Sequence, residues 1–129
     1  MDKSSLLSAF NNHFGDFAED IANYFPENME IKTSINACYA IRKINPALII
    51  KVWKSSVVNP YQKQIDAGDF DFFINKDYSE DINIDQKDRA LQVIEKLRVL
   101  IPRMAKEDQD KCMQYVKNLT TLSTHYFKA

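Results

Sequence analysis

The stretch ALIIKVWKSSVV, residues 47–58, is the most apolar part of this 129-residue chain. Its apolar side chains recur at helical spacing and cover a wide arc of the helix circumference. They are Leu48, Ile49, Val52, Trp53 and Val57. Since so wide an apolar arc must be covered by other elements, the stretch predicts a central, buried helix over 46–58, around which the rest of the chain packs.

Asparagine–proline pairs mark both ends of this central helix. Asn45-Pro46 precedes it and Asn59-Pro60 follows it, and each pair is typical of an N-cap residue with proline at the first helical position. The second pair therefore predicts a new short helix, which ends at Ala67-Gly68 as its C-cap. A further short helical piece is expected over 70–75, with its aromatic residues in the core.

Four longer segments carry an apolar stripe at alternating spacings of three and four, which is typical of an amphipathic helix. They span 4–24, 29–44, 85–101 and 106–127. The inward-facing residues expected for the first two are Leu7, Phe10, Phe14, Phe17, Ile21 and Tyr24, and Ile31, Ile35, Cys38, Ile41 and Ile44. For the last two they are Ala90, Leu91, Ile94, Leu97 and Ile101, and Cys112, Val116, Leu119, Leu122 and Tyr126. Phe25-Pro26 and Pro102 end the helices before them, because proline disfavours the α region in the preceding residue.

These elements predict an all-α fold, a compact single-domain bundle of about five to seven helices over residues 1–129. Composition agrees, because the chain has only two glycines against roughly nine at average usage. Hairpins and phosphate-binding loops both depend on glycine. The first and last helices carry similar stripes, so they are expected to pack on each other, with pairing to a partner chain as the alternative.

The ends and cysteines of the chain favour a soluble protein of a reducing, intracellular compartment. The N-terminal MDKSSLLSAFNNHF lacks the apolar region of a signal peptide, and no apolar run approaches the roughly 18 residues of a membrane span. Cys38 and Cys112 lie inside helical patterns and form no CxxC pair. Two reduced, buried thiols are therefore expected, with one disulfide between them as the alternative.

Charge is layered along the chain although its net value is -1. Residues 31–65 contain six bases and no acid, and residues 66–88 contain eight acids and two lysines. The bases are Lys32, Arg42, Lys43, Lys51, Lys54 and Lys63. With Tyr39, Trp53 and Tyr61 in the same stretch, they form a candidate surface for nucleic acid or another anion, through phosphate neutralisation and base stacking. The alternative is a solvated face, or one that pairs with the acidic stretch, with Trp53 in the core.

The acidic stretch contains a candidate calcium loop, DYSEDINIDQKD at residues 77–88. Asp77, Ser79, Asp81, Asp85 and Asp88 stand at positions 1, 3, 5, 9 and 12 of an EF-hand-like pattern. Ile82, however, stands where the loop needs glycine, and an aspartate at position 12 is shorter than the usual bidentate glutamate. A polar loop leading to a helix N-terminus is the favoured interpretation.

His13 and His125 are the only histidines, and neither has a second ligand one turn away, which disfavours a zinc site. His13 with Asp16 or Asp20 has the composition of a base with its orienting acid. No nucleophile is tied to that pair by the sequence, so a place on the helix surface or the core edge is the favoured interpretation. We therefore expect no catalytic residue, no metal site and no cofactor.

The stretch 44–81, INPALIIKVWKSSVVNPYQKQIDAGDFDFFINKDYSED, carries Asn45-Pro46, an IIKVW helix and a DFFINKDYSED run. In these motifs, in FNNHF near the N-terminus and in YVKNLTTLS near the C-terminus, the chain resembles an uncharacterised family of small α-helical proteins of large nucleocytoplasmic DNA viruses. The resemblance implies a viral gene product in the host cell cytoplasm or the virion. It implies no reaction, because the family has no assigned catalytic residues.

These observations together favour a non-enzymatic helical interaction or assembly module of a large DNA virus. Its expected partner is a viral or host protein, a homo-oligomer is compatible with the terminal stripes, and no membrane contact is expected. A nucleic-acid-associated protein that uses the basic 32–63 stretch is the alternative.

Overall fold

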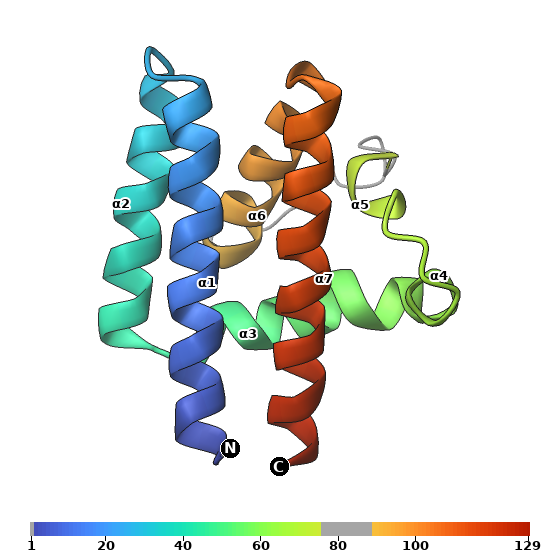
Figure 1. The fold of residues 1–129 in the computed structure, drawn as a ribbon. Helices are drawn as coiled ribbons and strands as arrows, with labels where there is room; N and C mark the ends of the chain where they lie inside the picture. The colour runs from blue at the N-terminus through green and yellow to red at the C-terminus, as the bar shows by residue number, and fades with distance from the viewer. Residues whose placement is uncertain (1, 76–88) are drawn as a thin grey trace.

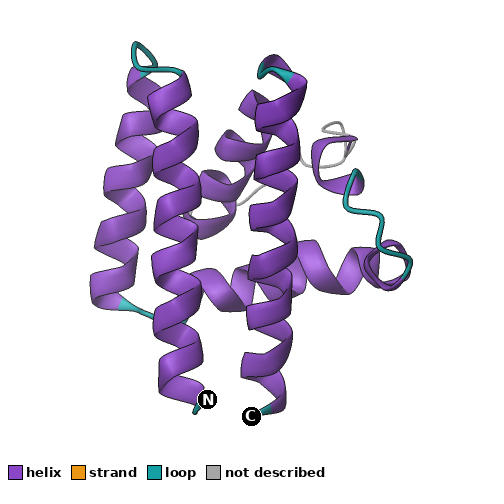
Figure 2. Cartoon of the chain, viewed as in Figure 1, coloured by secondary structure: helices purple, strands orange, loops and turns teal. Residues whose placement is uncertain are grey.

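The computed structural model describes residues 2–75 and 89–129, and its regular elements in these ranges are helical (Figure 1, Figure 2). The long helices are α1 (Lys3–Tyr24), α2 (Met29–Ile44), α6 (Arg89–Leu100) and α7 (Lys106–Lys128). The shorter elements are α3 (Leu48–Trp53), the π-helical turn η1 (Lys54–Val58), the 3-10 turn η2 (Asn59–Tyr61), α4 (Gln62–Asp66), α5 (Phe72–Asn75) and the 3-10 turn η4 (Ile101–Arg103). The predicted all-α bundle is confirmed.

The first and last helices pack on each other along their length, as expected from their stripes. They run antiparallel, so the two ends of the chain lie at the same end of the bundle (Figure 1). α2 packs on α1 and α6, and α3 crosses the long helices and contacts α1, α2, α6 and α7. None of the helices in the described ranges has both the length and the hydropathy that a membrane span requires.

The core is centred on Trp53 of α3, whose side chain is completely buried. Its ring meets Phe10 and Phe14 of α1 edge-on, with centroids 6.2 Å apart in each pair, and lies 5.6 Å from Phe73 of α5. The indole Nε1 donates a hydrogen bond to Oγ1 of Thr120 in α7, at 3.2 Å. The prediction of a central, buried helix is therefore confirmed, and Trp53 joins three helices through one side chain.

A short helix follows Asn59-Pro60 as predicted, as the 3-10 turn η2 and then α4, but Asn59 does not cap it. Asn59 has helical dihedrals (φ -61°, ψ -47°) instead of the extended backbone of an N-cap, and the helical geometry is interrupted at Tyr61 (φ -121°, ψ 27°) before α4 begins. Proline lacks an N–H and its ring clashes with the carbonyl four residues earlier. The π turn absorbs this conflict by widening the helix, so that Asn59 N–H donates to the carbonyl of Lys54, five residues back.

Asn45 also differs from the expectation, because it terminates α2 instead of capping α3 with its side chain. Its extended backbone (φ -142°, ψ 86°) is the conformation that a following proline favours. α3 then begins at Leu48 without a side-chain cap. By contrast, the ends predicted at Phe25-Pro26 and Pro102 are confirmed, since α1 stops at Tyr24 and α6 at Leu100.

The ends of two predicted apolar stripes were assigned wrongly. In α1, Leu6 is buried while Leu7 is half-buried, and Tyr24 is 40% exposed. In α2, Ile44 points outward and is 85% exposed. In the last turn of a helix, no further apolar residue shows which side of the helix faces the core. The neighbouring elements then determine which side chain is covered.

Gly68 ends the helical run with a Schellman motif, which confirms the predicted C-cap. Its φ is +76°, its N–H donates to the carbonyl of Ile65 at 3.0 Å, and Asp69 N–H donates to that of Gln64 at 2.9 Å. A residue with left-handed backbone conformation at this position allows two backbone carbonyls in the last turn of the helix to accept hydrogen bonds. Asp69 in turn accepts a hydrogen bond from Asp71 N–H through its side chain, at 3.0 Å.

Alanine substitutions at the two glycines should shift stability in opposite directions. Gly68→Ala is expected to lower the free energy of unfolding by about 1 kcal/mol, because an L side chain is strained in the left-handed region. Gly15→Ala should raise it by about 0.5–1 kcal/mol, because Gly15 lies inside α1 and its new Cβ would meet only Tyr39, at 3.8 Å. Urea-unfolding midpoints measure both changes, and a shift of the same sign in both variants would contradict this explanation.

Candidate functional site

The acidic side of α1 is held by tyrosines from the helices on either side of it. Tyr115 of α7 donates its hydroxyl hydrogen to Oδ2 of Asp20, at 2.6 Å, and Tyr39 of α2 donates to Glu19. Asp16, Glu19 and Asp20 share this side of α1 at helical spacing, a pattern usual on a solvated helix face. The carboxylates are exposed, but two of them also connect α1 to its neighbours.

His13 does not bond the acids that the sequence offered as its partners. Its ring packs on Tyr115 with a centroid distance of 4.7 Å, and its Nε2 lies 3.3 Å from the side-chain Nδ2 of Asn118. Asp20 is instead the acceptor for the Tyr115 hydroxyl. His13 is half-buried at the core edge, as the favoured interpretation held, and no base–acid pair is formed with Asp20.

The pKa shifts of Tyr115 and His13 both favour the uncharged form of the side chain. Burial, together with the hydrogen bond to Asp20, raises the pKa of the Tyr115 hydroxyl, so the tyrosine remains a hydrogen-bond donor at neutral pH. Burial lowers the pKa of His13, against the charge of Asp16, which raises it. A phenol and an imidazole held neutral between two helices are suited to a structural contact.

Acidification should weaken the packing of α1 on α7 through His13. Because the folded pKa lies below the ordinary value of 6.5, the unfolded chain binds the proton more readily, and stability falls as the pH drops below about 6.5. A protonated Nε2 can also no longer accept the Asn118 amide hydrogen. Unfolding free energies at pH 7 and pH 5 should therefore differ more for the wild type than for His13→Gln. Equal pH dependence in the two proteins would contradict this role.

Arg98 of α6 is a buried charge that sequence reasoning missed, and it is only 1% exposed. Its Nη1 donates to the backbone carbonyl of Phe73 at 3.0 Å, and its Nη2 pairs with Oε2 of Glu95 at 2.7 Å. The bond to Phe73 attaches α5 to α6, and the pair with Glu95 lies within α6. An arginine between apolar neighbours was the only local signal, and it does not distinguish a buried side chain from one that reaches solvent.

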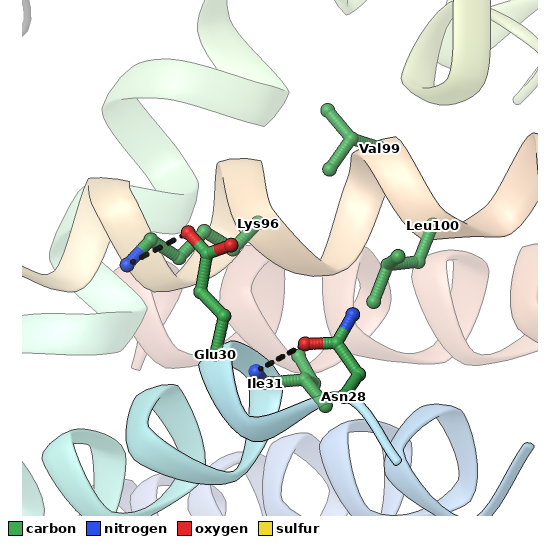
Figure 3. A pocket seen from close by; sticks show the side chains of 6 residues that line it. All are labelled: Asn28, Glu30, Ile31, Lys96, Val99 and Leu100. Carbon is green, nitrogen blue, oxygen red and sulfur yellow. Dashed lines mark hydrogen bonds and ion pairs between the residues drawn. The ribbon is translucent and has the colours of Figure 1, made fainter. Parts of the chain in front are cut away.

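The hollow between α2 and α6 is too small for a metabolite (Figure 3). Its volume is about 60 Å³, whereas small-molecule sites usually enclose about 300–1,000 Å³. The residues around it have structural bonds: Lys96 pairs with Glu30 at 3.5 Å, and Asn28 caps α2 by accepting from Ile31 N–H at 3.1 Å. This hollow is a seam between two packed helices.

Residues 2–75 and 89–129 show neither a reactive thiol nor a metal centre. Cys38 and Cys112 are buried and unbridged, as expected, and burial raises the pKa of each thiol to about 11. Protonated thiols are poor nucleophiles at neutral pH. Within these ranges no three His, Cys, Asp or Glu side chains gather as metal ligands. The calcium hypothesis concerned residues 77–88, which lie outside the described residues.

The six candidate bases are spread over the fold and do not form one patch. Lys32, Arg42 and Lys43 belong to α2, Lys51 to α3, Lys54 to η1 and Lys63 to α4. α2 and α4 lie on opposite sides of the bundle, with α3 crossing between them (Figure 1). Within the described residues, none of the six bases forms an ion pair. No carboxylate of residues 2–75 and 89–129 therefore offsets their positive charge by direct contact.

The aromatic residues of the basic stretch are mostly covered. Trp53 is in the core, and Tyr61 stacks on Phe72 with centroids 4.5 Å apart and an interplanar angle of 16°. Tyr39 is the exception, with 41% of its surface exposed. The expectation that Trp53 lies in the core is confirmed, and Tyr39 is the one of the three aromatics that is exposed.

Tyr39 lies at an open hollow of about 630 Å³ near the C-terminal end of α2. We call its lining residues, Tyr39, Ala40, Arg42 and Lys43, the α2-end surface. Arg42 is half-buried and fixed by a 2.7 Å hydrogen bond from its Nη2 to Oδ1 of Asn12 in α1. The surface combines a positioned guanidinium with an exposed ammonium and an exposed aromatic ring.

Comparison with known proteins identifies no relative of this chain. No protein-family model, curated protein or solved structure matches the chain. The functional argument therefore rests on the side chains themselves.

Proposed function

We propose that this protein is a non-enzymatic helical interaction or assembly module. The observation that carries the proposal is the C-terminal end of α2, where Ile44 is 85% exposed and where Arg42 and Lys43 form no ion pair with any residue in 2–75 and 89–129. A branched apolar side chain in water gains free energy when a partner covers it. The motifs of residues 44–81 support placing this module in a large DNA virus, where it would act in the host cell cytoplasm or the virion.

The polar groups of the fold support this proposal, because they are engaged in holding helices together. Tyr115 joins α7 to α1, Arg42 joins α2 to α1, and Arg98 joins α6 to α5. Each is committed to a structural hydrogen bond. A catalytic site would instead need such groups to converge on one hollow with room for a substrate.

Nucleic acid is the second candidate partner, favoured by the six bases, which pair with no acid in the described part of the chain. It is the weaker candidate, because the bases are spread from α2 to α4 and Trp53 is not available for stacking. If it is correct, single-stranded DNA should bind and weaken steeply between 50 and 200 mM salt, as about three or more phosphate contacts require. Lys43→Glu, Lys51→Glu and Lys54→Glu together should then abolish binding, and unchanged binding would exclude this surface.

The interaction-module proposal is tested by purifying the tagged protein from infected cells with and without nuclease, followed by mass spectrometry. Specific partners that survive nuclease treatment are expected. Partners that disappear with nuclease would transfer the assignment to nucleic acid. A strictly monomeric protein that retains no partner under either condition would remove the basis of the proposal.

A further inference from the structure

The α2-end surface is built from side chains that share one side of α2 and are held from α1. Tyr39, Arg42 and Lys43 stand at relative positions i, i+3 and i+4, so they are neighbours on that side of the helix. The hydroxyl of Tyr39 donates to Glu19, and Nη2 of Arg42 donates to Oδ1 of Asn12 at 2.7 Å. All three α2 side chains line the same open hollow of about 630 Å³, so a single ligand can contact them together.

Part of this arrangement has a structural explanation. The two hydrogen bonds connect α2 to α1, and Arg42 and Lys43 lie in the last turn of α2, where positive charge interacts favourably with the helix dipole. This role leaves donors unused, however, because a guanidinium has five N–H groups and the described residues accept from Nη2 of Arg42 alone. Asn12 is also neutral, so it does not cancel the charge that it holds in place. A positioned guanidinium beside an ammonium is suited to an oxyanion.

The ring of Tyr39 is fixed at one end and open elsewhere. Its hydroxyl is bonded to Glu19 and lies above Gly15, where an added Cβ would be 3.8 Å from the Tyr39 oxygen. The residue is nevertheless 41% exposed. Because the orientation of the ring is already set, a planar ligand that stacks on it costs little further side-chain entropy.

The charge of the surface changes from one edge to the other. The edge at the Tyr39 hydroxyl carries the carboxylate of Glu19, whereas Arg42 and Lys43 form no ion pair with residues 2–75 and 89–129 and make the other edge positive. The two anchors, Asn12 and Glu19, are seven residues apart in α1, which is about 10 Å along the helix axis. A matching ligand therefore has an anion at one end, a flat ring in the middle and hydrogen-bond donors at the other end.

We infer that the α2-end surface binds one nucleotide, either free or as a unit of single-stranded nucleic acid. Arg42 and Lys43 receive its phosphate, and its base stacks on the ring of Tyr39. The edge of the base faces Glu19, whose carboxylate has acceptor sites beyond the one that Tyr39 uses. Guanine fits best, because its N1–H and N2–H₂ donors stand side by side, whereas adenine and cytosine each offer a single amino group. The inference goes beyond the proposed interaction function and requires no protein partner.

A single nucleotide fits this surface better than a long strand or a phosphorylated side chain. A long strand needs a track of phosphate contacts, but the hollow offers two bases, and Lys51 and Lys63 belong to other elements. A phosphorylated serine would use the two bases and leave the Tyr39 ring uncovered and Glu19 without a donor. The ring and the carboxylate therefore distinguish a nucleotide from phosphate alone.

The test titrates the isotope-labelled full-length chain with GMP, UMP, guanosine and inorganic phosphate and follows the backbone amide signals by NMR. GMP is expected to shift the signals at the C-terminal end of α2. It should bind about tenfold more tightly than guanosine or inorganic phosphate, because guanosine lacks the phosphate contacts and phosphate lacks the stacking. UMP should bind more weakly than GMP, because uracil stacks over a smaller area and has one N–H donor.

Substitutions assign the contacts. Tyr39→Ala and Arg42→Gln should each weaken GMP binding about tenfold, whereas Tyr39→Phe keeps the ring and should weaken it less than about threefold. Glu19→Gln should reduce the preference for GMP over UMP and leave the phosphate contacts intact. Tyr24→Ala and Arg103→Gln are matched controls, because these exposed residues lie at the opposite end of the bundle, where α1 ends and α7 begins (Figure 1). They should change the affinity less than about twofold.

An eight-nucleotide RNA of uridines with one guanosine distinguishes the two sources of the nucleotide. An affinity about tenfold or more above that of GMP assigns the site to single-stranded nucleic acid, and a smaller gain assigns it to the free nucleotide. Three outcomes would overturn the inference: no binding of GMP at millimolar concentration, inorganic phosphate that binds as tightly as GMP, or an affinity that Tyr39→Ala leaves intact.

Circular dichroism and urea unfolding should show all variants folded, because the substituted side chains are at least partly exposed. Cellular protein partners that survive nuclease, together with failed nucleotide titrations, would leave the interaction function standing and refute this site alone.

Discussion

Replacing Trp53 with alanine is expected to lower the free energy of unfolding by about 4 kcal/mol. The side chain is completely buried, and α3 delivers it between α1, α5 and α7. Truncation removes its contacts with three aromatic rings and leaves a cavity that the surrounding helices fill only in part. A domain of this size has about 5–15 kcal/mol of stability in total, so the variant should be partly unfolded at moderate temperature.

Two milder variants separate the packing of Trp53 from its hydrogen bond. Trp53→Phe keeps most of the ring volume and should lose about half as much stability. Thr120→Val removes the acceptor of the indole N–H and should cost about 1–3 kcal/mol, because the buried donor is left unsatisfied. Chemical denaturation followed by circular dichroism reports all three values. A loss below about 1 kcal/mol in Trp53→Ala would mean that this residue does not organise the core.

Arg98→Ala should destabilise the protein by about 3 kcal/mol or more. The substitution takes a guanidinium away from the carbonyl of Phe73 and from Glu95, whose side chain is only 12% exposed. Removing one member of a buried ion pair exposes the other to the full cost of its desolvation. Since the same guanidinium attaches α5 to α6, hydrogen exchange should also accelerate first in α5.

An exposed ion pair in the same protein provides the control. Lys106 pairs with Asp110 at 2.9 Å, but their side chains are 81% and 63% exposed. Lys106→Ala should leave the unfolding midpoint unchanged within error, because exposed pairs are screened by solvent and compete with side-chain entropy. Comparable losses in Arg98→Ala and Lys106→Ala would show that burial does not determine the strength of these pairs.

Helix identities and most helix ends were predictable because their signals are local. Phe25-Pro26 and Pro102 end helices through the conformation of one backbone bond, and Gly68 does so through its left-handed φ. Asn59-Pro60 was predictable only in part. The short helix after this pair was expected, but Asn59 stays helical at the end of a π turn instead of acting as an N-cap. That π turn is packed into the core through Val57 and Val58, which are both buried, and this tertiary contact has no local signal.

The candidate surface was only partly predictable. Arg42 and Lys43 were recognised as basic residues, but the charge pattern did not indicate that Asn12 positions Arg42 from thirty residues away. The apolar stripe placed Ile44 inward, whereas its side chain is 85% exposed at the end of α2. The partnership of Tyr115 with Asp20, ninety-five residues apart, had no local signal at all.

The sequence by itself determined that this protein is an all-α bundle with Trp53 at its centre. Apolar periodicity and proline placement act within one or two turns, and any fold of this chain must satisfy them. Only the tertiary structure decided which side chains at helix ends are covered, that Arg98 is buried and paired, and that α2 and α4, which both carry bases, lie on opposite sides of the bundle. These outcomes depend on contacts between residues distant in sequence, and such contacts form only when the helices are placed against one another.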